Sequence, residues 1–175
     1  MGYLLGEELP LALTNTQLLK IARSINEDRT LSAQRKSAYV SSGALTTFVL
    51  NHGMVGVNKE LMNLTAKNGC LESVKILRAH DPPCPWDVWT CSAAATGGHL
   101  DVLQWLRSQH SPCPWGKLTC SGAAEGGHLH VLQWLRSQDP PCPWDDWTCM
   151  HAASGGHLHV LQWARSQDPS CPWDV

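Results

Sequence analysis

Apolar residues recur at helical spacing between polar positions over much of the chain. Leu100, Leu103 and Leu106 fall on one side of a helix, with Val102 beside them and polar residues on the opposite side. This spacing predicts an amphipathic helix over about residues 99–108. A helix of this kind has to bury its apolar side, so the pattern also predicts packing against neighbouring helices.

A second helix is predicted directly before the first one, over about residues 88–96. Three consecutive alanines, which favour helices, lie inside this segment, and Asp87 before it is a good N-cap residue. Gly97 and Gly98 follow, and glycine tolerates the left-handed conformation in which many helices end. The sequence therefore predicts two short helices joined by a glycine turn.

This pattern recurs along the chain at a step of 29 residues. The tripeptide Cys-Pro-Trp begins at Cys84, Cys113, Cys142 and Cys171, and a Gly-His-Leu tripeptide recurs in the same register. The predicted regular units cover residues 84–112, 113–141 and 142–170, and an incomplete unit covers 171–175. Two short helices cannot bury their apolar sides alone, so the units are expected to stack on one another.

The first half of the chain follows the pattern less closely. Degenerate units are predicted at about residues 37–54 and 55–83, so that the array covers 37–175. Residues 1–36 are expected to form an N-terminal helical cap or a linker, because they contain one short amphipathic helix candidate over 16–25.

Residues 94–103 resemble the ankyrin-repeat consensus around Ala-Ala-x-x-Gly-His-Leu-Glu-Val-Val, and the copies over 123–132 and 152–161 resemble it again. The Cys-Pro-Trp and Leu-Gln-Trp motifs are similar to those of ankyrin arrays in algae, other protists and giant DNA viruses. The resemblance implies an all-α, ankyrin-like solenoid of stacked helix–turn–helix repeats. Ankyrin units usually have about 33 residues. The shorter step here falls where the family places its β-hairpin, so a shortened or absent hairpin is expected.

The resemblance implies a scaffold that binds another, unidentified protein through the concave face formed by the first helix of each unit. The positions on this helix that differ between units are the candidates for contact with the partner, and the constant positions are expected to form the core. The candidate partner-binding residues are Val88, Trp89, Ser92, Thr96, Lys117, Leu118, Ser121, Glu125, Asp146, Trp147, Met150, His151 and Ser154.

Trp89 and Trp147 allow two interpretations, because tryptophan is common both in binding hot spots and in partly buried packing. Leu118 occupies the equivalent position in the unit between them. Packing is the favoured interpretation, since most tryptophans in such a position are partly buried.

Composition and charge narrow the range of functions. The formal net charge of -2 argues against a nucleic-acid binder, which needs clustered Lys and Arg. No apolar run of about 18 residues predicts a membrane span, and the start of the chain lacks the basic region of a signal peptide. An intracellular protein of the cytoplasm is expected, with the nucleus as the alternative location. Free thiols are expected for the eight cysteines in such a reducing compartment.

Three other functions depend on specific residues or segments. Cys84, Cys91 and His99 recur together, but a zinc site usually contains a tight Cys-x₂₋₄-Cys pair, so a zinc-binding structural repeat is only an alternative. Catalysis is not expected, because the chain lacks phosphate-cradling and nucleophile motifs; no cofactor or small-molecule substrate is expected either. By analogy with related ankyrin proteins that carry an F-box, residues 1–36 are a second alternative, as an adapter to ubiquitin ligase machinery.

Overall fold

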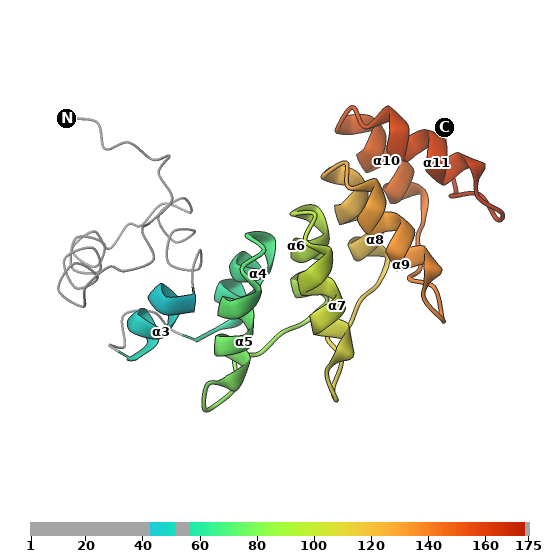
Figure 1. Cartoon of the computed structure of the whole chain (residues 1–175). Helices are drawn as coiled ribbons and strands as arrows, with labels where there is room; N and C mark the ends of the chain where they lie inside the picture. The colour runs from blue at the N-terminus through green and yellow to red at the C-terminus, as the bar shows by residue number, and fades with distance from the viewer. Residues whose placement is uncertain (1–42, 52–56, 174–175) are drawn as a thin grey trace, which may run out of the picture.

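The computed structural model describes residues 43–51 and 57–173, and this part of the chain is helical without any β-strand (Figure 1). The helices are α3 (Gly43–Asn51), α4 (Lys59–Lys67), α5 (Leu71–Ala79), α6 (Val88–Thr96), α7 (Leu100–Ser108), α8 (Lys117–Glu125), α9 (Leu129–Ser137), α10 (Asp146–Ser154) and α11 (Leu158–Ser166).

The helices form a row of pairs (Figure 1). We call α4, α6, α8 and α10 the A helices; they lie side by side, each against the next. We call α5, α7, α9 and α11 the B helices, and each one packs against the A helix before it. Consecutive A helices begin 29 residues apart, and so do consecutive B helices. The array is therefore built from one structural unit that recurs with the sequence pattern.

The helix bounds predicted from the sequence agree closely with the two observed helices of a unit. The predicted helix over residues 88–96 is α6, and the predicted helix over 99–108 is α7, which begins one residue later at Leu100. His99 stands just before α7 with non-helical backbone angles and without a side-chain cap. Because no described residue belongs to a strand, the segments between units are loops here rather than β-hairpins.

Polar groups fix where α6 begins. The Asp87 carboxylate accepts a hydrogen bond from the backbone N of Trp89 at 3.0 Å, and the backbone N of Asp87 donates to the Thr90 hydroxyl at 3.3 Å. These contacts satisfy groups that a helix start otherwise leaves without partners. At the other end, Gly98 has a φ of 78°, a left-handed conformation that glycine adopts without steric cost.

A continuous apolar core runs between the two rows of helices. In α7, Val102, Leu103 and Leu106 are fully buried, and they pack with Cys91 and Ala94 of α6 in one cluster that extends through the neighbouring units. Burial of apolar surface stabilises the array by about 25 cal/mol for each Å² removed from water. The expectation that the constant positions form the core is confirmed for Cys91, Ala94 and Leu103.

An arginine and a tryptophan join each of α5, α7 and α9 to the loop that follows it. The Arg107 guanidinium lies over the Trp115 ring at 4.1 Å and donates a hydrogen bond to the Cys113 carbonyl oxygen at 2.8 Å. Trp115 in turn packs edge-on against Trp134, with ring centroids 5.9 Å apart. The same arrangement recurs around Trp86 and Trp144. The half-buried tryptophans thus hold the loops against the B helices.

Histidines connect neighbouring units. The imidazole Nε2 of His128 lies 3.0 Å from the Thr96 carbonyl oxygen at the end of α6, one unit earlier. His99 and His157 make the equivalent hydrogen bonds to Lys67 and Glu125, both at 2.9 Å. These bonds occupy carbonyl groups that would otherwise be unpaired at the C-termini of α4, α6 and α8.

Part of the predicted organisation lies outside the described residues. This holds for the cap or linker over 1–36, for the short helix over 16–25 and for the end of the chain at 174–175. The adapter hypothesis rests on the same N-terminal segment.

Candidate functional site

The candidate partner-binding residues differ in how much of their surface they expose. Most of them are exposed on the A helices: Trp89, Lys117, Leu118, Glu125, Trp147, Met150 and Ser154. The others are half-buried, namely Val88, Ser92, Thr96, Asp146 and His151, with the exception of Ser121, which is buried. The A helices therefore bring together nearly all of the predicted residues on the surface of the array.

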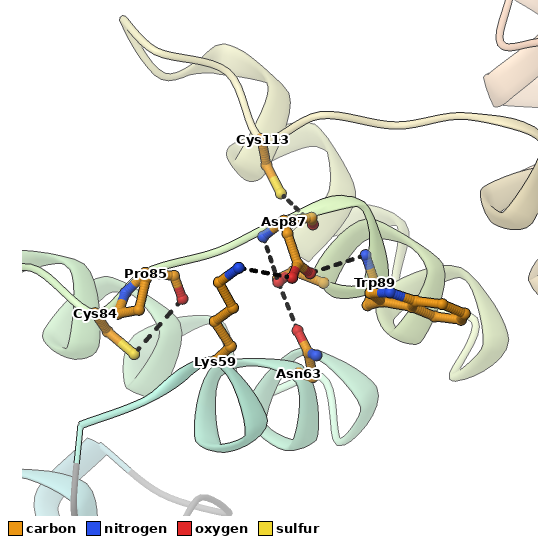
Figure 2. Close-up of polar contacts among 8 residues, drawn as sticks. Lys59, Asn63, Cys84, Pro85, Asp87, Trp89 and Cys113 are labelled. Carbon is orange, nitrogen blue, oxygen red and sulfur yellow. Dashed lines mark hydrogen bonds and ion pairs between the residues drawn. The ribbon is translucent and has the colours of Figure 1, made fainter.

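Trp89 and Trp147 are among the most exposed large apolar side chains. Their exposed fractions are 56% and 54%, so the favoured interpretation of both residues as packing tryptophans is wrong. Figure 2 shows Asp87 between Lys59 and the backbone of Trp89, with the Trp89 ring directed away from these polar contacts. Other tryptophans, such as Trp115, pack against the B helices, whereas Trp89 and Trp147 lie on the exposed side of the first turns of α6 and α10.

Ser121 cannot act as predicted, because only 6% of its surface is exposed. Its neighbour Gly122 explains the burial: a Cβ added at Gly122 would lie 2.7 Å from the Thr96 hydroxyl oxygen of α6. The absence of a side chain at Gly122 thus lets α8 approach α6 closely, and Ser121 is covered at the seam. The Ser92 hydroxyl also crosses this seam and donates to the Leu118 carbonyl oxygen at 2.9 Å.

Ion pairs join the starts of neighbouring A helices in two places, between α4 and α6 and between α8 and α10. The Lys59 ammonium lies 3.3 Å from the Asp87 carboxylate, and the Lys117 ammonium lies 3.5 Å from the Asp145 carboxylate in the same geometry. Exposed pairs of this kind contribute little to stability, about 0–1 kcal/mol. They lie at the starts of α6 and α10, next to the first turns that carry Trp89 and Trp147.

Trp147 belongs to a small aromatic and polar cluster across α8 and α10. Its ring stacks on His151 with centroids 5.7 Å apart, and the His151 Nδ1 lies 3.8 Å from the Glu125 carboxylate. Met150, beside them on α10, is exposed. The structure therefore brings four of the predicted residues together in one place, although they come from two units.

Cysteine thiols contact backbone carbonyl oxygens at several places in the array. All eight are free thiols, and seven of them are buried. The Cys113 thiol donates to the Asp87 carbonyl oxygen at 3.3 Å, whereas the Cys91 thiol lies 3.7 Å from the Cys113 carbonyl oxygen. A hydrogen bond with the Cys113 thiol, followed by burial, raises the pKa of the Cys91 thiol. Burial likewise raises the pKa of the Cys84 thiol to about 11. These thiols stay protonated near neutral pH, a state in which they do not ligate metals well.

The zinc alternative combined Cys84, Cys91 and His99, and the structure separates these side chains. Cys84 donates to the Asn58 carbonyl oxygen at 3.2 Å, and His99 contacts the Lys67 carbonyl oxygen in a different place. Among the described residues, no group of three or more His, Cys, Asp or Glu side chains is arranged to hold a metal ion. Cys84 and His99 thus contact the backbone of the preceding unit, whereas Cys91 contacts the Cys113 carbonyl oxygen of the following unit.

Two histidines lie close together at the start of α9. His130 is exposed, and its ring centroid is 6.1 Å from that of His128. Residues two apart inside a helix point in different directions, but His128 precedes the first residue of α9, so this rule does not apply to the pair. The glycine pair just before His128 is the sequence signal for this turn.

The chain matches no protein-family model, and no curated protein matches it. The resemblance to ankyrin repeats therefore rests on the sequence motifs alone. None of the described helices is long and apolar enough to cross a membrane.

Proposed function

We propose that this chain is a protein-interaction module of the ankyrin type, which binds its partner through the exposed face of the A helices. One observation carries the proposal. Trp89, Leu118 and Trp147 are exposed at the same position of three consecutive A helices. The apolar residues between the row of A helices and the row of B helices are, in contrast, almost all buried.

Exposure of these side chains carries a free-energy cost that folding alone does not explain. Single exposed apolar residues are normal on protein surfaces, but three aligned large ones in a row mark a contact site for another molecule. Tryptophan is also enriched among the few residues that dominate binding energy in protein interfaces. The neighbouring exposed Met150 extends the same apolar surface on α10.

Hydrogen bonds hold the helices that carry this face in place. Asp87 caps the helix that carries Trp89, and the hydrogen bond between His128 and Thr96 holds α6 to the following unit. A preorganised surface loses little conformational entropy when it binds, which favours affinity. This rigidity supports a binding role for the face.

The test is affinity capture from a cell extract with three matched proteins: wild type, a face variant and a control variant. The face variant carries Trp89→Ser and Trp147→Ser, which replace exposed side chains and spare the core. The control carries Gln104→Ala and Gln133→Ala, two exposed positions on the B helices. We expect wild type and control to capture the same partner and the face variant to lose it, by about tenfold or more.

Circular dichroism and thermal melting of all three proteins provide the folding control. Equal capture by the face variant and wild type, with all three folded, would show that the A-helix face is not the binding surface. Loss of capture by the Gln104→Ala/Gln133→Ala protein alone would show that the binding surface lies on the B helices.

A further inference from the structure

One row of side chains crosses the A-helix face. It consists of Glu60, Trp89, Leu118 and Trp147, which occupy equivalent positions in the first turns of α4, α6, α8 and α10. All four are exposed, and the helices that carry them lie side by side. We call this line the first-turn row. It begins with a carboxylate and continues with three apolar side chains.

The spacing along the first-turn row follows from helix packing. Packed helices have axes about 8–10 Å apart, so successive side chains of the row are separated by about that distance. A ligand that contacts all of them needs side chains on one side at the same interval. This interval limits which backbone conformation the ligand has.

Three regular backbones give different intervals. A polyproline II segment has three residues per turn and a rise of about 3.1 Å, so every third residue points the same way at about 9.3 Å. A β-strand repeats on one side at about 6.6 Å, or at about 13 Å for every fourth residue. An α-helix reaches about 10.5 Å only with every seventh residue. Polyproline II and the α-helix are the two that fit.

Hydrogen bonding separates these two candidates. No described residue accepts a hydrogen bond from the indole Nε1 of Trp89 or Trp147, and Trp147 offers one ring face to His151 instead. A polyproline II segment has no internal hydrogen bonds, so its carbonyl groups are free to accept from these donors. An α-helix uses its backbone carbonyls internally. Aromatic surfaces with free donors are the usual partners of polyproline II segments.

Charge determines what the ligand carries at one end. Glu60 makes no ion pair with any described residue, whereas its neighbour Lys59 is committed to Asp87 at 3.3 Å. A basic residue three positions from the nearest apolar residue of the ligand would lie at Glu60. The carboxylate at the end of the row therefore favours a ligand with a basic terminus.

We propose that the first-turn row binds an extended, proline-rich segment of the partner in the polyproline II conformation. Its apolar residues, at every third position, contact Trp89, Leu118 and Trp147, and a basic residue pairs with Glu60. This inference rests on the proposed function, since it names the kind of partner that the A-helix face binds.

The test is fluorescence anisotropy of labelled peptides with the full chain. The probe is Arg-Pro-Pro-Leu-Pro-Pro-Leu-Pro-Pro-Leu, used together with the reversed sequence because polyproline II ligands can lie in either direction. One comparison peptide has its leucines at every second position, and another is a helix former with leucines at every seventh. We expect a proline-rich probe in one of the two directions to bind at least about tenfold more tightly than either comparison peptide.

Substitutions in the protein assign the binding to the row. Trp89→Ala and Trp147→Ala are each expected to weaken the probe by about tenfold or more, whereas Gln104→Ala on a B helix leaves it unchanged. Glu60→Lys should weaken binding of the probe that carries arginine and strengthen binding of a probe with glutamate in place of the arginine. This exchange of preference is not expected from a variant that merely disturbs the fold.

The inference is overturned if the helical or the every-second-position peptide binds as well as the proline-rich probes, or if both probes bind more weakly than about 1 mM. It is also overturned if Glu60→Lys does not exchange the preference. Failure of the probes together with loss of cellular capture by Trp89→Ser/Trp147→Ser would leave the proposed function standing. Failure of the probes, together with unchanged capture by Trp89→Ser/Trp147→Ser, would contradict both the proline-rich ligand and the proposed function.

Discussion

The units over 113–141 and 142–170 have nearly the same sequence, yet the structure buries them to different extents. Leu129 in the first of these units is half-buried, whereas Leu158 at the same position in the second is 63% exposed. The only difference in their surroundings is the neighbour: α10 and α11 follow the first unit, and no described helix follows the second. Burial in this array is thus a property of the stack rather than of the unit.

The glycine turns show the same contrast in detail. At Gly127, a Cβ would lie 2.5 Å from the His157 ring of the next unit, whereas at Gly156 nothing lies within 4 Å. Both glycines have a φ of 73°. Ala124 is fully buried, and Ala153 at the same position is exposed. Stability in such an array is a sum of unit and interface terms, and these pairs of positions separate the two.

The largest expected effect compares a core leucine of the inner unit with an exposed leucine of the last one. Leu135→Ala removes a fully buried side chain of α9 and should lower the free energy of unfolding by about 2–5 kcal/mol. Leu158→Ala removes an exposed side chain of α11 and should change it by less than about 0.5 kcal/mol. Urea denaturation followed by circular dichroism measures both. Equal losses would mean that Leu158 is covered in solution, for instance by a second molecule.

The glycine pair gives the next largest difference. An alanine at a φ of 73° is strained at either position, at a cost of about 1–2 kcal/mol. At Gly127 the added Cβ also displaces His157, whose hydrogen bond to the Glu125 carbonyl oxygen is worth about another 1 kcal/mol. We therefore expect Gly127→Ala to destabilise the chain more than Gly156→Ala. Thermal melts of the two variants side by side check this, and equal melting temperatures would show that the histidine contact contributes nothing.

Local sequence signals were sufficient to predict the helices. Asp87 and Gly98 mark the start and the end of α6 through their own backbone and side-chain preferences, independently of the neighbouring units. The burial of Leu103 and Leu106 followed from their helical spacing. These features depend on interactions within one unit, so a single sequence contains the information for them.

The errors all concern contacts between units. Trp89 was expected to pack, but the side of α6 that carries it faces no neighbour. Ser121 was expected to be accessible, but Gly122 lets the adjacent helix approach and cover it. Spacing within a unit does not reveal how closely two helices approach, so these features required the stack itself.

The smallest expected effect concerns protonation at an inner contact between units. Burial lowers the pKa of His128, and the nearby His130, His99 and His157 lower it further. The hydrogen bond to the Thr96 carbonyl oxygen at 3.0 Å raises the pKa and offsets only part of this shift. The unfolded chain therefore takes up a proton at this position at a higher pH than the folded chain does. Stability follows the difference in bound protons, so it should fall as the pH drops through about 6.5.

The matched variant is His128→Gln, which keeps an N–H donor of similar reach and does not titrate. We expect the free energy of unfolding of wild type to fall more between about pH 7.5 and about pH 5.5 than that of the variant. Urea titrations at both pH values give this difference, and only the change with pH is compared, because the substitution also shifts stability at every pH. Parallel pH dependence in the two proteins would mean that His128 is protonated equally well in the folded and unfolded chain. In that case the burial of His128 would not disfavour its charged form in the folded chain.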